Sequence, residues 1–331
     1  MEEKILETIK KYNLIENEDK IVIGVSGGPD SITLLDVLLK IKAQGIIKFE
    51  IVVCHINHLI REEAIEDENY VINYCKRNNI ECYINRTKIK EVSKKEKIGT
   101  EEAGRKVRYD FFNEILEKTN SNKIATAHNK NDNAETVLMN IIRGSGTSGL
   151  KGIEAKRKNI IRPLIKIERK EIEEYCKNNN LNPRIDKTNY ENEYTRNKVR
   201  NMLIPYIKDN FNPNIIDAIS RLSDLSKEEN NYLESKAKEE YQKVLLEKKV
   251  DCIILDLKRF NLIETVIKNR IVLYTINELF GTKSGIEKKH IEDIIKLCDN
   301  NIGNKYLIPN KKVKILVKNK KIFYIVNKVL P

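Results

Sequence analysis

Short runs of apolar residues alternate with amphipathic stretches through the first half of the chain. The apolar runs predict five buried strands, and the 3.6-residue periodicity between them predicts helices. The predicted strands are 21–25, 51–54, 81–84, 123–127 and 160–165, and the predicted helices are 32–41, 62–77, 101–118 and 132–142. This alternation indicates an α/β fold, a doubly wound (Rossmann-like) parallel five-stranded sheet. Ligands are then expected at the carboxyl ends of the strands.

The pattern changes after the segment Asn-Phe-Asn-Pro at 210–213. A long helical stretch without strands is predicted there, followed by two shorter helices and a β-hairpin. The expected ranges are 215–248, 262–279, 287–297 and, for the hairpin, 313–326. We therefore predict two domains, 1–212 and 213–331, the second one smaller and mainly helical. The length of 331 residues agrees with this division, since single cores usually stop growing near ~250–300 residues.

Composition narrows the class of protein. No run of about 18 apolar residues occurs, so no transmembrane helix is expected, and the acidic start Met-Glu-Glu-Lys is unlike a signal peptide. Six cysteines without a Cys-x-x-Cys pair predict reduced thiols in a cytoplasmic protein and argue against a thiolate metal site. The net charge of +12 favours a polyanionic partner, with nucleic acid and acidic membranes both left open by composition alone.

The segment Val-Ser-Gly-Gly-Pro-Asp-Ser at 25–31 leaves the first strand and opens the first helix. Its glycines let backbone amides approach an anion, and the helix N-terminus adds free N–H groups. The serines add hydroxyl donors, and the aspartate is placed where a Mg²⁺ ion bridging phosphates would bind. The alternative is an ordinary glycine-rich turn; a Walker A loop is excluded because no Gly-Lys-Ser/Thr is present. The predicted phosphate-binding residues are Ser26, Gly27, Gly28, Pro29, Asp30 and Ser31.

A second polar segment, residues 127–136, follows the fourth strand at the same edge of the sheet. Asp132 and Glu135 are three residues apart and share one helical face, where they could hold a cation or an ammonium group. His128 lies at the end of the strand. The alternative is that the acids complement the helix dipole and the histidine serves only as a cap.

Residues 144–149 fit the dinucleotide pattern G-x-G-x-x-G. That fingerprint requires a strand before it and a helix after it, whereas here a helix precedes it. We therefore predict a flexible loop near the substrate and no nicotinamide or flavin site.

The loop at 26–31 resembles the signature of the N-type ATP pyrophosphatases, which cleave ATP to AMP and pyrophosphate. Further segments narrow the resemblance to the tRNA(Ile)-lysidine synthetase family, in its compact form without an extra C-terminal domain. They are 55–58 with Arg61 and Asp67, 101–105 with 108–112, 128–136, 143–146 with 149–150, 162–164, 186–189 and 196–200. One departure matters: Asn131 stands where the family usually carries the first of two adjacent acids. A two-carboxylate role would then fall on Asp132 and Glu135.

The resemblance implies ligation of free L-lysine to C2 of the wobble cytidine, position 34, of an isoleucine tRNA with a CAU anticodon. The C2 oxygen would attack the α-phosphate of ATP, and the ε-amine of lysine would then attack C2 and expel AMP. ATP and Mg²⁺ are the implied cofactors, with Asp30 as the metal ligand. The implied catalytic residues are Asp30, Arg105, His128, Asp132 and Glu135. ATP would also contact His55, Arg196 and Arg200, while lysine and cytidine would meet Asp132, Glu135, Arg143, Gly144, Ser145 and Gly146.

Two basic clusters are candidates for tRNA phosphates, with solvated surface as the alternative. The first contains Lys156, Arg157 and Lys158, then Arg162, Lys166, Arg169 and Lys170; the second, residues 311–331, has seven lysines and no acid and includes Lys311, Lys312 and Lys314. Phosphate contacts from such clusters give salt-dependent affinity without base specificity.

Three other functions are weighed against this one. A 2-thiocytidine synthetase should carry a cysteine pair for a cluster, and an amidotransferase would need a glutaminase domain for which no segment is left. An RNA-binding relative without catalysis would have no need for the acids at 30, 132 and 135. The sequence leaves the oligomeric state open, a homodimer included.

Overall fold

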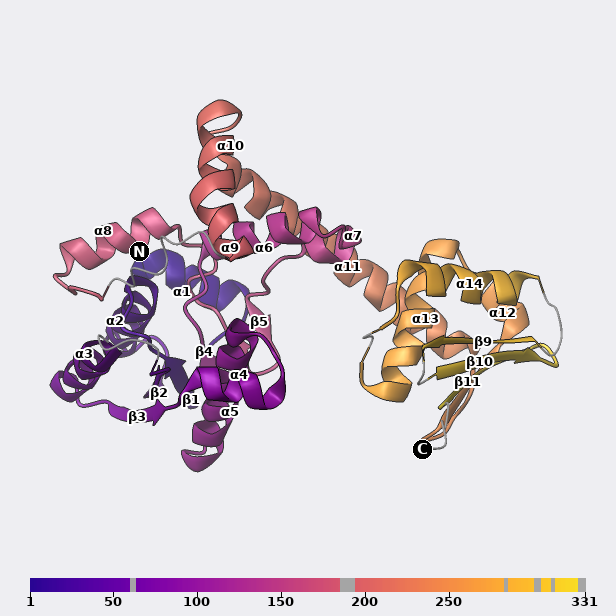
Figure 1. The fold of residues 1–331 in the computed structure, drawn as a ribbon, viewed down its shortest axis with the longest axis horizontal. Helices are drawn as coiled ribbons and strands as arrows, with labels where there is room; N and C mark the ends of the chain where they lie inside the picture. Colours follow the sequence, from indigo (N-terminus) through magenta and orange to yellow (C-terminus); the bar gives the residue numbers. More distant parts are fainter. Residues whose placement is uncertain (60–63, 185–193, 283–284, 301–304, 311–312, 327–331) are drawn as a thin grey trace. The chain divides into compact units, whose positions relative to one another are not determined.

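The computed structural model describes residues 1–59, 64–184, 194–282, 285–300, 305–310 and 313–326 (Figure 1). The chain forms two compact units, Met1–Asp224 and Leu225–Pro331. The division between them falls inside helix α11 (Ile215–Val244). The assignment of separate functions to 1–212 and 213–331 stays a prediction.

The first unit is built on a six-stranded sheet with the order β3-β2-β1-β4-β6-β5. Its neighbours pair in parallel from β3 to β6, and β5 alone in this sheet runs antiparallel to its neighbour. The strands are β1 (Asp19–Gly24), β2 (Phe49–Asn57), β3 (Glu81–Arg86), β4 (Lys123–Ala125), β5 (Lys156–Arg157) and β6 (Ile160–Ile161). The predicted α/β fold is confirmed, but five strands must be corrected to six. The sequence pattern misses β5 because it is two exposed basic residues long.

Helices cover both faces of this sheet (Figure 1). The helices of this unit that precede α11 are α1 (Glu2–Lys11), α2 (Pro29–Ala43), α3 (Ala64–Arg77), α4 (Ile89–Glu96), α5 (Thr100–Lys118), α6 (Lys130–Ile142), α7 (Gly146–Leu150), α8 (Arg169–Asn178), α9 (Thr195–Lys198), the π-helical η2 (Val199–Leu203) and α10 (Ile204–Asn210). The periodicity predicts α2, α3, α5 and α6, and it misses the charged helices α4 and α8. The loop expected at 144–149 contains the short helix α7, so this part of the prediction is wrong.

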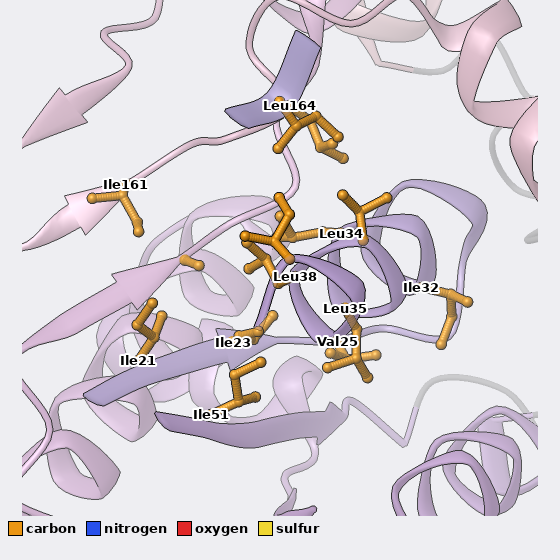
Figure 2. Close-up of a cluster of buried hydrophobic side chains, with 14 of the residues drawn as sticks. Ile21, Ile23, Val25, Ile32, Leu34, Leu35, Leu38, Ile51, Ile161 and Leu164 are labelled. Carbon is orange, nitrogen blue, oxygen red and sulfur yellow. The ribbon is translucent and has the colours of Figure 1, made fainter. Parts of the chain in front are cut away.

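The central strand β1 is apolar on both faces, as its continuous run of branched residues predicts. On one face, Ile21 and Ile23 pack with side chains of α2 such as Leu35 and Leu38 (Figure 2). On the other face, Val22 packs against the phenylalanines of α5. A β-carbon at Gly24, the end of β1, would lie 2.3 Å from Phe112 Cζ, so only glycine allows this approach.

The order of the strands defines where a ligand can bind. From β1 the chain proceeds to β2 and β3 on one side, and it returns to β4 and β6 on the other. The crevice of an open α/β sheet opens at such a reversal, beyond the carboxyl ends of the strands. The loops that follow β1 and β4 therefore meet at this edge.

The second unit contains a five-stranded antiparallel sheet with the order β7-β8-β11-β10-β9. Its strands are β7 (Leu245–Lys248), β8 (Cys252–Asp256), β9 (Lys305–Asn310), β10 (Val313–Lys318) and β11 (Lys321–Val326), and its helices are the end of α11, α12 (Leu257–Asn261), α13 (Thr265–Phe280) and α14 (Lys288–Asp299). The hairpin of β10 and β11 is confirmed. The predicted second domain of helices with a terminal hairpin is confirmed, but the predicted helix over 215–248 ends at Val244 and is followed by the unpredicted strand β7, and β8 and β9 were also not predicted.

Membrane insertion receives no support from the helices. Among those in the described ranges, none combines the length and the apolar character that crossing a bilayer requires.

Candidate active site

The loop after β1 is a tight turn held by its own serines. Gly27 has φ +89°, a conformation that favours glycine, and its carbonyl accepts a hydrogen bond from the backbone N–H of Arg184 at 3.0 Å. Ser31 Oγ accepts from the Ser26 amide at 3.1 Å and donates to the Gly28 carbonyl at 3.0 Å. Gly28 is the N-cap of α2, and Pro29 follows in the first turn. The loop is thus shaped as a helix N-terminus open to an anion.

Asp30 links this loop to the loop after β4. Its Oδ1 accepts a hydrogen bond from Asn129 Nδ2 at 3.0 Å. Burial raises the pKa of Asp30 to about 6, and the neighbouring Asp132 carboxylate adds to the effect. Two acids at one edge repel each other, and a bound cation would relieve that repulsion.

Asn129 and Asp132 begin α6 with reciprocal hydrogen bonds. Asn129 Oδ1 accepts from the Asp132 amide and Asp132 Oδ2 accepts from the Asn129 amide, both at 3.0 Å. This capping box fixes the Asp132 carboxylate at the helix N-terminus. The other oxygen, Oδ1, is left to face the arginines of the site.

Three acids and three arginines form a charge-balanced group that we call the balanced cluster. Its members are Asp30, Asp132, Glu135, Arg169, Arg196 and Arg200. Glu135, with a side chain only 1% exposed, accepts from Arg200 Nε at 2.5 Å and from Arg196 Nε at 2.8 Å. Arg200 Nη2 also donates to Asp132 Oδ1 at 3.0 Å. Buried charges require such partners.

Packing against α6 explains how the two arginines of α9 and η2 reach these acids. Val199 and Ile204 lie in one apolar cluster with Ala134 and Val137 of α6. Arg196 and Arg200, four residues apart on the same helical face, are thereby directed to Glu135. The structure thus places both arginines on the acids; their predicted contacts with ATP phosphates stay a prediction.

A pocket of about 430 Å³ adjoins the balanced cluster, and Arg196 belongs to both. We call it the cationic pocket, since its described lining includes six cationic side chains and one acid, Glu154. The six are Arg105, Arg143, Lys151, Arg157, Arg162 and Arg196. His128 also lines the pocket, and burial together with Arg162 and Arg196 lowers its pKa to about 3, so that the imidazole is neutral at pH 7.

Amide side chains of α6 fix the wall of this pocket. Asn133 Oδ1 accepts from the Ile153 amide at 2.6 Å, and Asn140 Nδ2 donates to the Gly149 carbonyl at 2.9 Å. Gly152 has φ +58°, and a β-carbon there would lie 2.2 Å from Asn133 Oδ1. The segment 144–153 is therefore held on α6 by hydrogen bonds.

The structure brings together most, but not all, of the predicted site residues. His55 is buried beneath the first loop, where its Nδ1 donates to the Val25 carbonyl at 2.8 Å. Gly144, Ser145 and Gly146 are exposed beside the pocket and are not among its described lining residues. Arg105 lies 4.9 Å from the Tyr109 ring at the pocket.

The first predicted tRNA cluster is divided by the fold. Arg157 lines the cationic pocket, whereas Lys156 and Lys158 are exposed outside it. Lys166 pairs with Asp224, and Arg169 belongs to the balanced cluster. In the second unit Lys314 lies 4.3 Å over the Tyr306 ring. Arg61, Lys311, Lys312 and the segment 186–189 lie outside the described residues.

Sequence reasoning missed the parts played by Asn129, Asn131 and Arg169. Asn129 bonds to Asp30 and caps α6, and a polar residue just before a helix is a signal for such a cap. Asn131 Oδ1 accepts from the Arg169 amide at 3.0 Å, a contact between residues 38 apart that no local pattern reveals.

A divalent ion would find only part of its coordination in the protein. Among the described residues, no three His, Cys, Asp or Glu side chains are grouped closely enough to hold a metal. Mg²⁺ commonly needs one or two carboxylates and takes its other ligands from water and phosphates. The mutually repelling Asp30 and Asp132 fit that requirement.

Comparisons with known proteins show which family this sequence resembles. The model of the PP-loop domain family matches residues 1–207. A tRNA(Ile)-lysidine synthase of Clostridioides difficile (strain 630) is 44% identical over 329 residues, which are 97% of this chain and 71% of that protein. One from Caldanaerobacter subterraneus subsp. tengcongensis is 45% identical over 310 residues, 93% of this chain and 66% of its own length. One from Bacillus cereus is 33% identical and is covered over 63% of its length. The chain thus spans about two thirds of these relatives.

A solved structure supports the fold alone. The U34-tRNA thiolase NcsA from Methanococcus maripaludis with its [4Fe-4S] cluster superimposes with a TM-score of 0.56 at 21% identity. The match covers 68% of this chain and 79% of the thiolase.

Proposed function

Since the chain belongs to the tRNA(Ile)-lysidine synthase family, we propose that it ligates free L-lysine to C2 of the wobble cytidine of a CAU-anticodon isoleucine tRNA at the expense of ATP. The products would be lysidine in the tRNA, AMP and pyrophosphate. One observation carries this proposal. The balanced cluster, beside the phosphate loop, and the cationic pocket adjoin each other and share Arg196.

Adenylation of the base is the first step. ATP phosphates bind the amides of the Gly27–Gly28 turn and the N-terminus of α2. Asp30 would hold Mg²⁺, which would supply positive charge to the phosphates when bound. The cytidine C2 oxygen attacks the α-phosphorus, and the bond to pyrophosphate breaks. Arg196 and Arg200, which pair with Asp132 at this edge, would stabilise negative charge on this group.

Substitution by lysine is the second step. The ε-ammonium must bind an acid and lose a proton before it attacks C2. Glu135 is occupied by both arginines through bonds of 2.5–2.9 Å, whereas Asp132 Oδ1 has one contact of 3.0 Å and looser ones at 3.5 and 3.8 Å. We therefore assign proton acceptance to Asp132 and the positioning of the arginines to Glu135. The C2–O bond then breaks and AMP leaves with the oxygen.

The cationic pocket would receive the cytidine and its flanking phosphates. A base inside a stacked anticodon loop must leave the stack before chemistry at C2 can occur. A pocket of about 430 Å³ is large enough for one nucleoside, and its arginines offer donors to the backbone on either side. Neutral His128 can donate or accept one hydrogen bond to the base. Gly144, Ser145 and Gly146 would close over it from the exposed segment beside the pocket.

The proposal also covers the lysines that would contact tRNA phosphates and the cellular location of the protein. Lys156, Lys158, Lys311, Lys312 and Lys314 would add phosphate contacts along the tRNA. The six cysteines are free thiols, which fits a protein of the reducing cytoplasm.

Incorporation of labelled lysine into tRNA tests the proposal directly. The protein is incubated with ATP, Mg²⁺, labelled L-lysine and a CAU-anticodon isoleucine tRNA, followed by nucleoside analysis. We expect lysidine at the wobble position and none in a transcript with uridine there. Pyrophosphate release without lysidine, or incorporation of sulfur in place of lysine from a sulfur donor, would contradict the assignment.

A further inference from the structure

Arg169, the first residue of α8, differs from the other arginines of the balanced cluster. Its Nη2 lies 3.9 Å from Asp30 Oδ2 and 3.8 Å from Asp132 Oδ1, too far for hydrogen bonds. Its Nε is buried and has no hydrogen-bond partner among the described residues. Arg196 and Arg200, by contrast, donate short hydrogen bonds to Glu135 at 2.8 and 2.5 Å, and Arg200 also donates to Asp132 at 3.0 Å. Donors of Arg169 are therefore still unused at the edge next to the phosphate loop.

The position of Arg169 is set from two sides. Asn131 Oδ1 accepts its backbone N–H at 3.0 Å and so ties the start of α8 to α6. Further along, α8 is bound to α2, since Tyr175 donates to Asp36 at 2.6 Å and Cys176 Sγ lies 3.2 Å from Thr33 Oγ1. The helix that carries Asp30 and the helix that carries Arg169 are thus held together.

Simple charge neutralisation does not account for this placement. An arginine kept only to balance buried acids gains most from short, paired hydrogen bonds, as Arg200 makes with Glu135. The Arg169 guanidinium instead stands between two carboxylates without bonding to either. A planar guanidinium with unused donors matches the oxygens of a phosphate or a carboxylate.

We propose that Arg169 binds an oxyanion of a substrate and that Asn131 is its positioning residue. The inference rests on the proposed function, in which two substrates bring such a group to this edge: the phosphates of ATP and the α-carboxylate of free lysine. The chemistry of recognition is the same for both, and binding measurements distinguish them.

Calorimetric titration of the full chain with separate ligands tests the assignment. The ligands are ATP, inorganic pyrophosphate, L-lysine and 1,5-diaminopentane, which is lysine without its carboxylate. The variants are Arg169→Ala, Arg169→Lys, Asn131→Ala and Asn131→Asp. The control is Lys177→Ala, an exposed lysine in the last turn of the same helix.

The two possible ligands of Arg169, a phosphate of ATP and the α-carboxylate of lysine, predict different changes in affinity. If phosphate is bound, Arg169→Ala weakens ATP and pyrophosphate about tenfold or more and leaves the preference for lysine over the diamine unchanged. If the carboxylate is bound, lysine falls to the affinity of the diamine while ATP is unaffected. In either case Arg169→Lys recovers part of the loss. Asn131→Ala weakens the same ligand by a smaller factor, and Asn131→Asp, which keeps the acceptor, restores it.

Unchanged affinities, within twofold for all four ligands in folded Arg169→Ala, would overturn the proposal. If that variant does not fold, Arg169→Lys decides, because equal affinity of this variant and the wild type for every ligand would also overturn it. The measurement needs no turnover. A wild-type protein that fails to make lysidine would contradict the proposed function, while loss of phosphate or lysine binding in Arg169→Ala would still support this role.

Discussion

The balanced cluster and the cationic pocket lie at the same edge of one sheet and share Arg196, yet their charges differ. The cluster sets three acids against three arginines, with Glu135 almost fully buried. The pocket lines its walls with six cations and, among the described residues, one acid. A buried charge needs an opposite charge beside it to offset the loss of hydration, whereas a charge that faces solvent stays hydrated until a ligand binds.

This difference separates stability from binding. Within the cluster, the ion pairs of Glu135 with Arg196 and Arg200 tie α9 and η2 to α6, so these three residues contribute to the fold as well as to the chemistry. The exposed pocket residues Arg143 and Arg157 face a space that an anionic ligand would fill, and their loss should spare the fold. The comparison would be wrong if removal of an ion-pair residue of the cluster spared the fold, or if removal of an exposed pocket residue destabilised it.

The largest effect is expected from Glu135→Ala. The change leaves Arg196 and Arg200 without their main partner, and breaking a buried ion pair from one side costs about 3–5 kcal/mol. Urea denaturation should show this loss of unfolding free energy. Glu174→Ala is the matched control, with an exposed side chain 3.9 Å from Lys170 and an expected change below about 0.5 kcal/mol. Equal stabilities of the two variants would mean that the cluster does not support the fold.

Asp30→Ala should abolish lysine incorporation and leave the fold intact. The Asp30 side chain makes one hydrogen bond within the described part of the chain, to Asn129, and its loss removes the proposed metal ligand beside the phosphates. We expect a rate about 100–1,000-fold lower in single-turnover lysidine formation, the range seen when a group that stabilises transition-state charge is removed. Wild-type-like incorporation would exclude Asp30 as a metal ligand.

The raised pKa of Asp30 predicts a pH-dependent stability difference between wild type and Asp30→Asn. The folded pKa of about 6 exceeds the ordinary 3.8, so the ionised form destabilises the folded state. Asparagine should therefore stabilise the protein by about 1–3 kcal/mol at pH 8. The gain should shrink as pH falls through 6, become small near pH 4 and vanish below the ordinary pKa of 3.8, where the wild-type carboxyl is protonated in both states. A difference that does not vary with pH between 4 and 8 would contradict the raised pKa.

The smallest effect on the protein itself is expected from Arg157→Ala in the cationic pocket. Its side chain is exposed, so unfolding free energy should change by less than about 0.5 kcal/mol. Affinity for tRNA should fall about fivefold at moderate salt, and the slope of log affinity against log salt should decrease by about 1. Lys42→Ala, in the last turn of α2, is the control with unchanged binding. Identical salt slopes for all three proteins would remove Arg157 from the interface.

The sequence predicted those parts of the molecule that repeat a local pattern. The alternation of apolar strands and amphipathic helices gives the parallel sheet, and polar segments after β1 and β4 must then meet at its carboxyl edge. This places Asp30 and Asp132 near each other before any coordinates are known. The resemblance of the motifs to a family supplies the chemistry.

Strands and side-chain contacts that depend on residues far away in the sequence could not be predicted from local patterns. The strands β5 and β7 consist mainly of exposed residues, and each becomes a strand through pairing with its neighbour. The sequence motifs indicate Arg196 and Arg200 only as contacts of ATP, whereas packing of η2 on α6 brings both to Glu135, more than 60 positions away. Asn131 shows its partner, the Arg169 amide, only once α8 is in place.

The central claim is that one edge of the sheet first adenylates a cytidine and then replaces the activated oxygen by lysine. A tRNA whose wobble cytidine carries oxygen-18 at C2 tests it most directly. If the account is right, mass spectrometry of the reaction with ATP and lysine finds the heavy oxygen in AMP, one atom for each lysidine formed. Unlabelled AMP, or label retained in the modified tRNA, would contradict it.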